Sequence, residues 1–362
     1  MKLVEFRKES SERSDSDNWS KSILQENTPY YFDSIEGCNQ NTANEVTHLI
    51  ERARVTAIDG KSTKQEIIDS IIELEGREVL QRKINFANCF NIQLSYVLYC
   101  DENENVFLFD FISLENVKFI KHYKSYLEFA NWIAEIKGWF SKKVFREIDD
   151  LPYFDKQLRK HKTPWPTNID CFVSDSKNNP IAIIEYQNAE DTGVLEHCNN
   201  DYFQCKISFT KNGYYGPYTV YSDDIRRWTS QEILRVQSEL KLIIITWSQN
   251  SSDFQIKEIE SVAIPFFPET NGKPDWKVMS TYKGELNKYV KSNRSLEKER
   301  VISSNRKTYN LHKTDEGVSS SVNEPPLSYG AKTFPSLYYN TKEKVENNKM
   351  ELIDAFSKII TS

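Results

Sequence analysis

Two patterns of apolar residues alternate along the chain. Short runs of β-branched and aromatic residues predict strands, and apolar residues three or four positions apart predict helices. The strand pattern gives a hairpin over Asn91–Ile112, turning at Asp101–Asn105, a buried strand at Lys241–Trp247 and a candidate further strand at Lys257–Pro265. Because both kinds of element are mixed along the sequence, we expect an α/β (α+β) fold with a mixed central sheet flanked by helices.

The helical pattern recurs over much of the chain. The predicted helices are Asn44–Arg54, the segment that follows Thr63, residues 126–136, Lys142–Asp150, Tyr153–Lys160, Gly193–Lys206, Ser230–Glu239, Trp276–Ser292 and Thr341–Ile360. The stretch Asn212–Tyr221 is rich in Gly, Tyr and Pro and predicts a loop or a hairpin.

The segment GKST invites comparison with a phosphate-binding loop. That motif needs a glycine at the position where Val55 stands, and no strong strand precedes the segment. Ser62 with Gln65, or Thr63 with Glu66, instead matches the capping box that begins a helix. We therefore interpret the segment as a helix start.

The sequence of Pro164–Gln187 predicts a β-hairpin. It contains two apolar runs, Ile169–Ser174 and Ile181–Tyr186, on either side of the polar segment Asp175–Pro180. Clusters of turn-forming residues between such runs predict a tight connection. We place a four-residue turn at Ser176–Asn179.

One acid lies in each run of this hairpin. With the turn at Ser176–Asn179, antiparallel pairing would place Asp170 opposite Glu185, with Gln187 following on the same face. Like charges directly opposed in a sheet are destabilising, so the pair needs a compensating partner. A divalent cation supplies one, and carboxylate oxygens are ligands that Mg²⁺ prefers.

Length and charge narrow the class of protein. The chain has 362 residues, enough for two domains with tails, and a net charge of −6, which argues against coating nucleic acid through global charge. The N-terminus has no apolar segment of the secretory kind, and no apolar run approaches the roughly 18 residues of a membrane span. We expect a cytoplasmic protein without membrane association.

Six cysteines are scattered through the sequence without a CxxC pair. This spacing predicts reduced and mostly buried thiols. A zinc site built from His197, Cys198 and Cys205 fits no common ligand spacing, so we set it aside.

The order of elements around the hairpin resembles the core of the PD-(D/E)xK nuclease superfamily, which includes many type II restriction endonucleases. The resemblance covers about Lys142 to Pro265: helix, strand with an acid, strand ending in Glu-x-Gln, helix and apolar strand. Asp170 and Glu185 match the two acids of the motif, and Gln187 stands where most members have lysine. Some restriction endonucleases of this superfamily use Glu-x-Gln.

This resemblance implies a metal-dependent phosphodiester hydrolase. Asp170, Glu185 and the backbone carbonyl of Tyr186 would hold Mg²⁺ or Mn²⁺, which polarises the phosphate and lowers the pKa of a bound water. Gln187 would orient that water through hydrogen bonds without adding charge. Glu147 is the candidate ligand of a second ion, with Asp155 behind it; a solvated helix face is an equal alternative for both.

Two clusters of basic residues are candidates for binding nucleic acid. Lys156, Arg159, Lys160 and Lys162 lie just before Asp170 and could clamp phosphates, and an ordinary charged helix end explains them equally well. The segment Tyr282–Lys313 contains nine Lys or Arg and three Glu, which makes it a candidate DNA-contacting arm.

With the resemblance, the chain is expected to divide into five parts. They are a disordered tail (1–22), a mixed α/β region for recognition or dimerisation (23–140), a nuclease-like core with a basic helical extension (141–295), a flexible linker (296–336) and a C-terminal helix (337–362).

The expected function is a Mg²⁺-dependent DNA endonuclease of the restriction or phage-defence kind, acting on double-stranded DNA. The two-fold symmetry of a duplex would suit a homodimer. One alternative is a non-catalytic module that keeps the fold and binds nucleic acid or a protein, as Gln187 in place of lysine would allow. Another is an interaction scaffold in which both acids are solvated edge residues.

Overall fold

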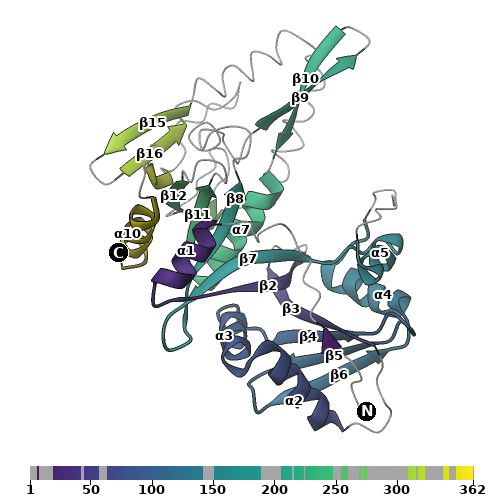
Figure 1. Ribbon diagram of the computed structural model, residues 1–362. Coiled ribbons are helices and arrows are strands. Elements are labelled where there is room, and N and C mark those ends of the chain that lie inside the picture. The colour runs from purple at the N-terminus through teal and green to yellow at the C-terminus, as the bar shows by residue number, and fades with distance from the viewer. Residues whose placement is uncertain are drawn as a thin grey trace. The chain divides into compact units, whose positions relative to one another are not determined.

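The structure is a computed structural model, drawn in Figure 1. It describes residues 6–7, 19–41, 45–56, 63–141, 151–188, 205–213, 216–223, 225–247, 254–259, 269–270, 273–274, 309–314, 317–322, 337–341 and 348–361. The chain forms two compact units. Unit 1 comprises Met1–Ser16, Pro29–Ala182 and Gln237–Glu239, and unit 2 comprises Asp17–Thr28, Ile183–Val236 and Leu240–Ser362. The division therefore falls inside the predicted nuclease-like core.

Unit 1 is built on a mixed sheet. Its strands are β1 (Phe6–Arg7), β2 (Tyr31–Gln40), β3 (Val46–Val55), β4 (Leu94–Tyr99), β5 (Val106–Phe111), β6 (Val117–Tyr123) and β7 (Thr167–Ser174), followed by the first residues of β8 (Pro180–Asn188). The order is β7-β2-β3-β4-β5-β6, with β1 paired to β3. All of these pairs are antiparallel except β3 with β4, which needs the helical crossover between them.

Helices cover both faces of this sheet. Helices α2 (Lys64–Glu75) and α3 (Arg77–Asn88) form the crossover, and α4 (Tyr126–Lys137) and α5 (Tyr153–Lys160) follow β6. Successive residues of a strand point to opposite faces. On β3, Glu51 reaches Lys83 of α3 while Arg52 reaches Asp155 of α5, so the two helix pairs lie on opposite faces.

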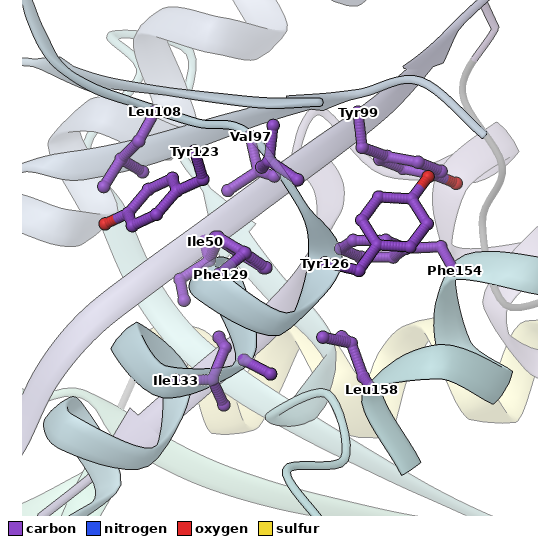
Figure 2. Packing of buried hydrophobic residues seen from close by; sticks show 12 residues of the cluster. Ile50, Val97, Tyr99, Leu108, Tyr123, Tyr126, Phe129, Ile133, Phe154 and Leu158 are labelled. Atoms are coloured by element: carbon purple, nitrogen blue, oxygen red, sulfur yellow. The ribbon is translucent and has the colours of Figure 1, made fainter. Parts of the chain in front are cut away.

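The α4–α5 side contains an aromatic core, shown in Figure 2. The rings of Tyr99 and Phe154 stack with centroids 4.2 Å apart, and Phe129 meets Tyr123 edge-on at 5.4 Å. All four side chains are buried. Burial of one such side chain contributes roughly 1.5–3 kcal/mol, so this cluster fixes α4 and α5 on the sheet.

The starts of α2 and α4 follow from their capping residues. Thr63 accepts the Glu66 amide hydrogen at 3.3 Å while the Glu66 carboxylate accepts the Thr63 amide at 2.7 Å, which confirms the predicted capping box in its second form. Ser125 accepts the Glu128 amide at 3.2 Å and caps α4. Gly138 ends α4 with a φ of 71°, a left-handed conformation that favours glycine.

Unit 2 contains a second group of paired strands. They are the remainder of β8, then β11 (Lys241–Trp247), β12 (Phe254–Ile259), β17 (Leu337–Thr341), β16 (Gly317–Val322) and β15 (Tyr309–Thr314) in that spatial order. Separate hairpins are β9 (Cys205–Gly213) with β10 (Gly216–Asp223), and β13 (Glu269–Thr270) with β14 (Lys273–Pro274).

Among the described residues of unit 2, the helices beside these strands are α1 (Trp19–Asn27), α7 (Ile225–Ser238) and α10 (Asn348–Thr361). Trp19 of α1 packs edge-on against Phe254, with ring centroids 6.4 Å apart. Phe254 pairs with Trp247, whereas the neighbouring Thr246 points to the other face and donates to Gln187 of β8. Glu185 lies on the same face of β8 as Gln187 and is bonded to Gln231 of α7. Helices α1 and α7 therefore cover opposite faces of β11.

The predicted fold class is confirmed, and so are several elements. The Asn91–Ile112 hairpin appears as β4 and β5, closed where the Cys100 amide donates to the Asn105 carbonyl at 3.0 Å. Lys241–Trp247 and Tyr153–Lys160 have the predicted bounds, and Asn212–Tyr221 takes the hairpin alternative in β9 and β10. Within the described residues, no helix is long and apolar enough to cross a membrane.

Other element predictions were wrong. Asn44–Arg54 is not a helix but contains most of β3, because pairing with β2 and β4 on its two edges outweighs its helical spacing. Helix α7 begins before Ser230, and α10 begins at Asn348, after a strand that ends at Thr341.

Two segments that were predicted to lack regular structure, the N-terminal tail and the linker, contain helix or strand. Helix α1 begins at Trp19, inside the segment predicted to be disordered. Strands β15 and β16 lie inside the segment predicted to be a flexible linker, where alternating Tyr, Leu and Val residues carry the strand pattern. The predicted helices Lys142–Asp150 and Trp276–Ser292, and residues 193–204 of a third, lie outside the described residues.

Candidate functional site

Glu185 lies in the middle of an apolar strand. The run from Ala182 to Ile184 is fully buried, which is typical of a strand with both faces covered. Glu185 itself is only 4% exposed and accepts a hydrogen bond of 2.6 Å from Nε2 of Gln231 on α7. Its carboxylate is therefore held in one orientation by a neutral amide.

Gln187 follows on the same face of β8, since side chains alternate along a strand. It is 6% exposed, and its Oε1 accepts a hydrogen bond of 3.2 Å from Oγ1 of Thr246, a fully buried residue of β11. Because that bond occupies the carbonyl end of the amide, Nε2 of Gln187 remains the donor end.

Gln231 has a further property that bears on metal binding. It is 7% exposed, and its Oε1 has no hydrogen-bond partner among the described residues. A buried polar atom left unpaired costs about 1–3 kcal/mol. This oxygen and the Glu185 carboxylate belong to side chains in direct contact, so the group offers oxygen ligands of the kind that Mg²⁺ takes.

Asp170, the other predicted acid, belongs to unit 1, whereas Glu185 and Gln187 belong to unit 2. Asp170 is partly exposed on β7 and accepts a hydrogen bond of 3.0 Å from Nδ2 of Asn168. The predicted facing of Asp170 and Glu185 stays a prediction.

The turn between β7 and β8 is shorter than predicted. The Asp175 amide donates to the Asn179 carbonyl at 2.9 Å, and the Asn178 amide donates to the Asp175 carbonyl at 3.0 Å. The loop is thus Ser176–Asn178 rather than Ser176–Asn179. Asn178 has a φ of 65°, which asparagine tolerates better than most residues, and this explains the tighter loop.

Side-chain hydrogen bonds fix the same loop. The Asp175 carboxylate accepts the amides of Lys177 and Asn179, each at 2.8 Å. Partial burial raises the pKa of Asp175, but the hydrogen bonds from Asn179 and Lys177 outweigh it and hold that pKa below its ordinary value. Asp175 therefore serves the turn.

The remaining candidate ligands are not assembled within the described residues. Glu147 lies outside them. Asp155 is not a solvated helix-face acid, because it is buried and forms an ion pair of 2.9 Å with Arg52. No group of three or more His, Cys, Asp or Glu side chains able to hold a metal occurs in the described part of the chain.

The predicted nucleic-acid residues lie at the end of α5 in unit 1. Arg159, Lys160 and Lys162 are exposed, and Lys156 is partly buried. The only acid of α5, Asp155, is directed inward to Arg52, so it does not neutralise the exposed cations.

The cysteine prediction holds where it can be examined. Cys38, Cys100 and Cys171 are buried free thiols and Cys89 is partly buried. Burial raises the pKa of Cys38 to about 12, so its thiol is protonated at neutral pH. His197 and Cys198 lie outside the described residues.

Two residues of the site escaped the sequence analysis. Gln231 contacts Glu185, and Thr246 contacts Gln187. The available signal was a single polar residue in an apolar setting: Thr246 interrupts the run KLIIITW, and Gln231 precedes the buried pair Ile233 and Leu234.

Comparisons with protein-family models, with curated proteins and with solved structures find no match to this chain. The functional argument consequently depends on the residues themselves.

Proposed function

We propose that the chain is a Mg²⁺-dependent endonuclease that hydrolyses phosphodiester bonds in double-stranded DNA. The observation that carries the proposal is the buried polar set Glu185, Gln187, Gln231 and Thr246 in an otherwise apolar part of unit 2. Burying these groups costs free energy, and binding of a metal and a phosphate would explain why an acid is held there.

The support differs between the two acids. Glu185 is supported by its buried position and by its hydrogen bond from Gln231 within unit 2, whereas Asp170 enters the proposal from the sequence motif alone.

Each residue has a distinct role in the proposed reaction. Asp170, Glu185 and the Tyr186 carbonyl would hold the ion, and Gln231 keeps the Glu185 carboxylate in position. A bound Mg²⁺ would supply Lewis-acid polarisation of the phosphate and a water of lowered pKa. Gln187, fixed by Thr246, would orient the attacking water through its Nε2 donor.

A cleavage assay on plasmid DNA with Mg²⁺ or Mn²⁺ tests this proposal. Asp170→Asn and Glu185→Gln should each abolish cleavage, because each removes a carboxylate ligand while keeping the side-chain shape. Glu115→Gln is the matched control, since Glu115 forms an exposed ion pair with Arg77. Full activity in either ligand variant would contradict the assignment, and sequencing of cut ends would show whether a two-fold site calls for a homodimer.

The second candidate is a module that binds nucleic acid or a protein without cleaving. The observation that favours it is the bond from Thr246 to Gln187, which gives the glutamine a structural role in the place where lysine supports catalysis. A wild-type protein that binds DNA but never cleaves it, with any divalent ion, would select this candidate. Gln187→Lys would then be the variant in which to look for gained activity.

A further inference from the structure

Two adjacent aromatic residues are exposed just beyond helix α4 in unit 1. Trp139 is 42% exposed and Phe140 is 54% exposed. Within α4 itself, Tyr126 and Phe129 are completely buried in the aromatic core. Gly138 ends the helix in a left-handed conformation, and the two rings that follow it are therefore not part of the core stripe.

This aromatic pair lies beside the basic end of α5. The Ser141 amide donates to the Lys162 carbonyl at 2.7 Å, and Nζ of Lys137 donates to the Pro164 carbonyl. The segments 137–141 and 162–164 consequently run side by side within unit 1. Nζ of Lys137 also lies 5.3 Å from the Trp139 ring centroid, a cation–π contact that helps to hold the ring.

Exposed cations gather at this place. Arg159, Lys160 and Lys162 are exposed, while the acid of α5, Asp155, is buried against Arg52. Lys162 has a φ of 63°, a conformation in which glycine would be less strained. A lysine at such a position adds charge at some cost in backbone energy.

We propose that Trp139, Phe140, Arg159, Lys160 and Lys162, here called the stacking surface, bind single-stranded nucleic acid. Exposed aromatic rings next to cations are the combination that holds single strands, because unpaired bases stack on the rings while the cations contact phosphates. In a duplex the base faces are already stacked, so this surface favours single strands. The proposal does not depend on hydrolysis by the chain.

The test measures fluorescence anisotropy of a labelled oligothymidylate on the full chain in EDTA, so that no metal-dependent cleavage can occur. Trp139→Leu and Phe140→Leu keep apolar bulk but remove a π face, and each should weaken binding between about 5- and 150-fold. Trp139→Phe should restore most of the affinity. Phe119→Leu, at an equally exposed aromatic on β6 (42%), is the matched control and should change nothing.

The variant Lys162→Gly distinguishes the contribution of the lysine charge to binding from its effect on the stability of the fold. It relieves the left-handed strain, so the free energy of unfolding should stay the same or rise. Removing the cation should lower affinity and reduce the slope of log affinity against log salt by about 0.7, the value for one phosphate contact on a single strand.

Four outcomes would overturn the proposal: no binding of the wild-type chain to oligothymidylate, equal losses for Phe119→Leu and Trp139→Leu, equal losses of duplex and single-strand binding in Trp139→Leu, or full competition by polyglutamate, which would indicate an acidic protein partner. Because the binding assay contains EDTA, its result does not depend on metal-dependent cleavage. A negative result would therefore reject the stacking surface without deciding whether the chain is a nuclease.

Discussion

Buried acids are handled differently in the two units. In unit 1, Asp155 pairs with Arg52 at 2.9 Å, and Glu51 pairs with Lys83 at 2.9 Å. In unit 2, the buried Glu185 accepts its hydrogen bond of 2.6 Å from the neutral amide of Gln231. An ion pair neutralises a carboxylate within the protein, and a hydrogen bond from an amide fixes the orientation of a carboxylate. The ion pairs stabilise unit 1, and the oriented Glu185 carboxylate is a ligand in the proposed metal site.

The ion pairs of unit 1 have additional support around them. The Arg52 guanidinium lies 4.6 Å from the Trp165 ring centroid and 3.7 Å from the Glu36 carboxylate. Nε1 of Trp165 in turn donates to the Glu36 carbonyl at 3.0 Å. Breaking one member of such a network leaves other buried groups without compensation.

The largest expected effect is therefore on Arg52. Arg52→Met should lower the free energy of unfolding by about 3–5 kcal/mol, because it leaves the Asp155 carboxylate buried and unpaired. Urea unfolding measures this loss. Arg52→Met combined with Asp155→Leu should recover much of it. A loss below about 1 kcal/mol in the single variant would show that these ion pairs are not structural.

Part of the fold could be predicted from the sequence because local signals decide it. The Thr63–Glu66 cap and the run Lys241–Trp247 each carry their own signal. Strand β3 could not be predicted, since its pairing with β2 and with β4, which begins only at Leu94, overrides the helical spacing.

The candidate site was predictable to the same extent. Glu185 and Gln187 stand out as polar residues in an apolar strand. Gln231 and Thr246 are identified only by tertiary packing, because they come from other elements. The loop length at Ser176–Asn178 also escaped prediction, since it depends on Asn178 adopting a positive φ.

Lys137 sharpens the comparison because it is a buried cation of unit 1 whose hydrogen bond goes to a neutral carbonyl, that of Pro164. Burial lowers its pKa to about 8. An unfolded lysine titrates near 10.4, so the unfolded state binds more protons between these pH values. Stability should therefore rise with pH over this range, by up to about 3 kcal/mol.

The measurement is the free energy of unfolding from pH 7.5 to 10.5 in the wild type and in Lys137→Met. The difference between the two proteins isolates this lysine from other titrating groups. Parallel pH profiles for the two proteins would contradict the assignment of a depressed pKa to Lys137.

The smallest expected effect is on the support of Gln187. Thr246→Val removes the donor to Gln187 Oε1 and keeps the side-chain shape. We expect a loss of roughly 1 kcal/mol in stability and a larger fractional loss of cleavage, because the amide is no longer held in one orientation. Thr163→Val, which removes another buried threonine hydroxyl, serves as the control, with a similar loss of stability and unchanged cleavage.

The central claim is that Glu185 is a metal ligand whereas Asp155 is structural. The most direct test uses calorimetry and thermal unfolding to measure Mg²⁺ binding by the wild type, by Glu185→Gln and by Asp155→Asn. The account predicts that Mg²⁺ binds and stabilises the wild type, by about 2.7 kcal/mol at a hundredfold excess over Kd. Asp155→Asn should be less stable but keep the Mg²⁺ shift, and Glu185→Gln should fold and lose the shift. An unchanged Mg²⁺ shift in Glu185→Gln, or none in the wild type, would contradict the account.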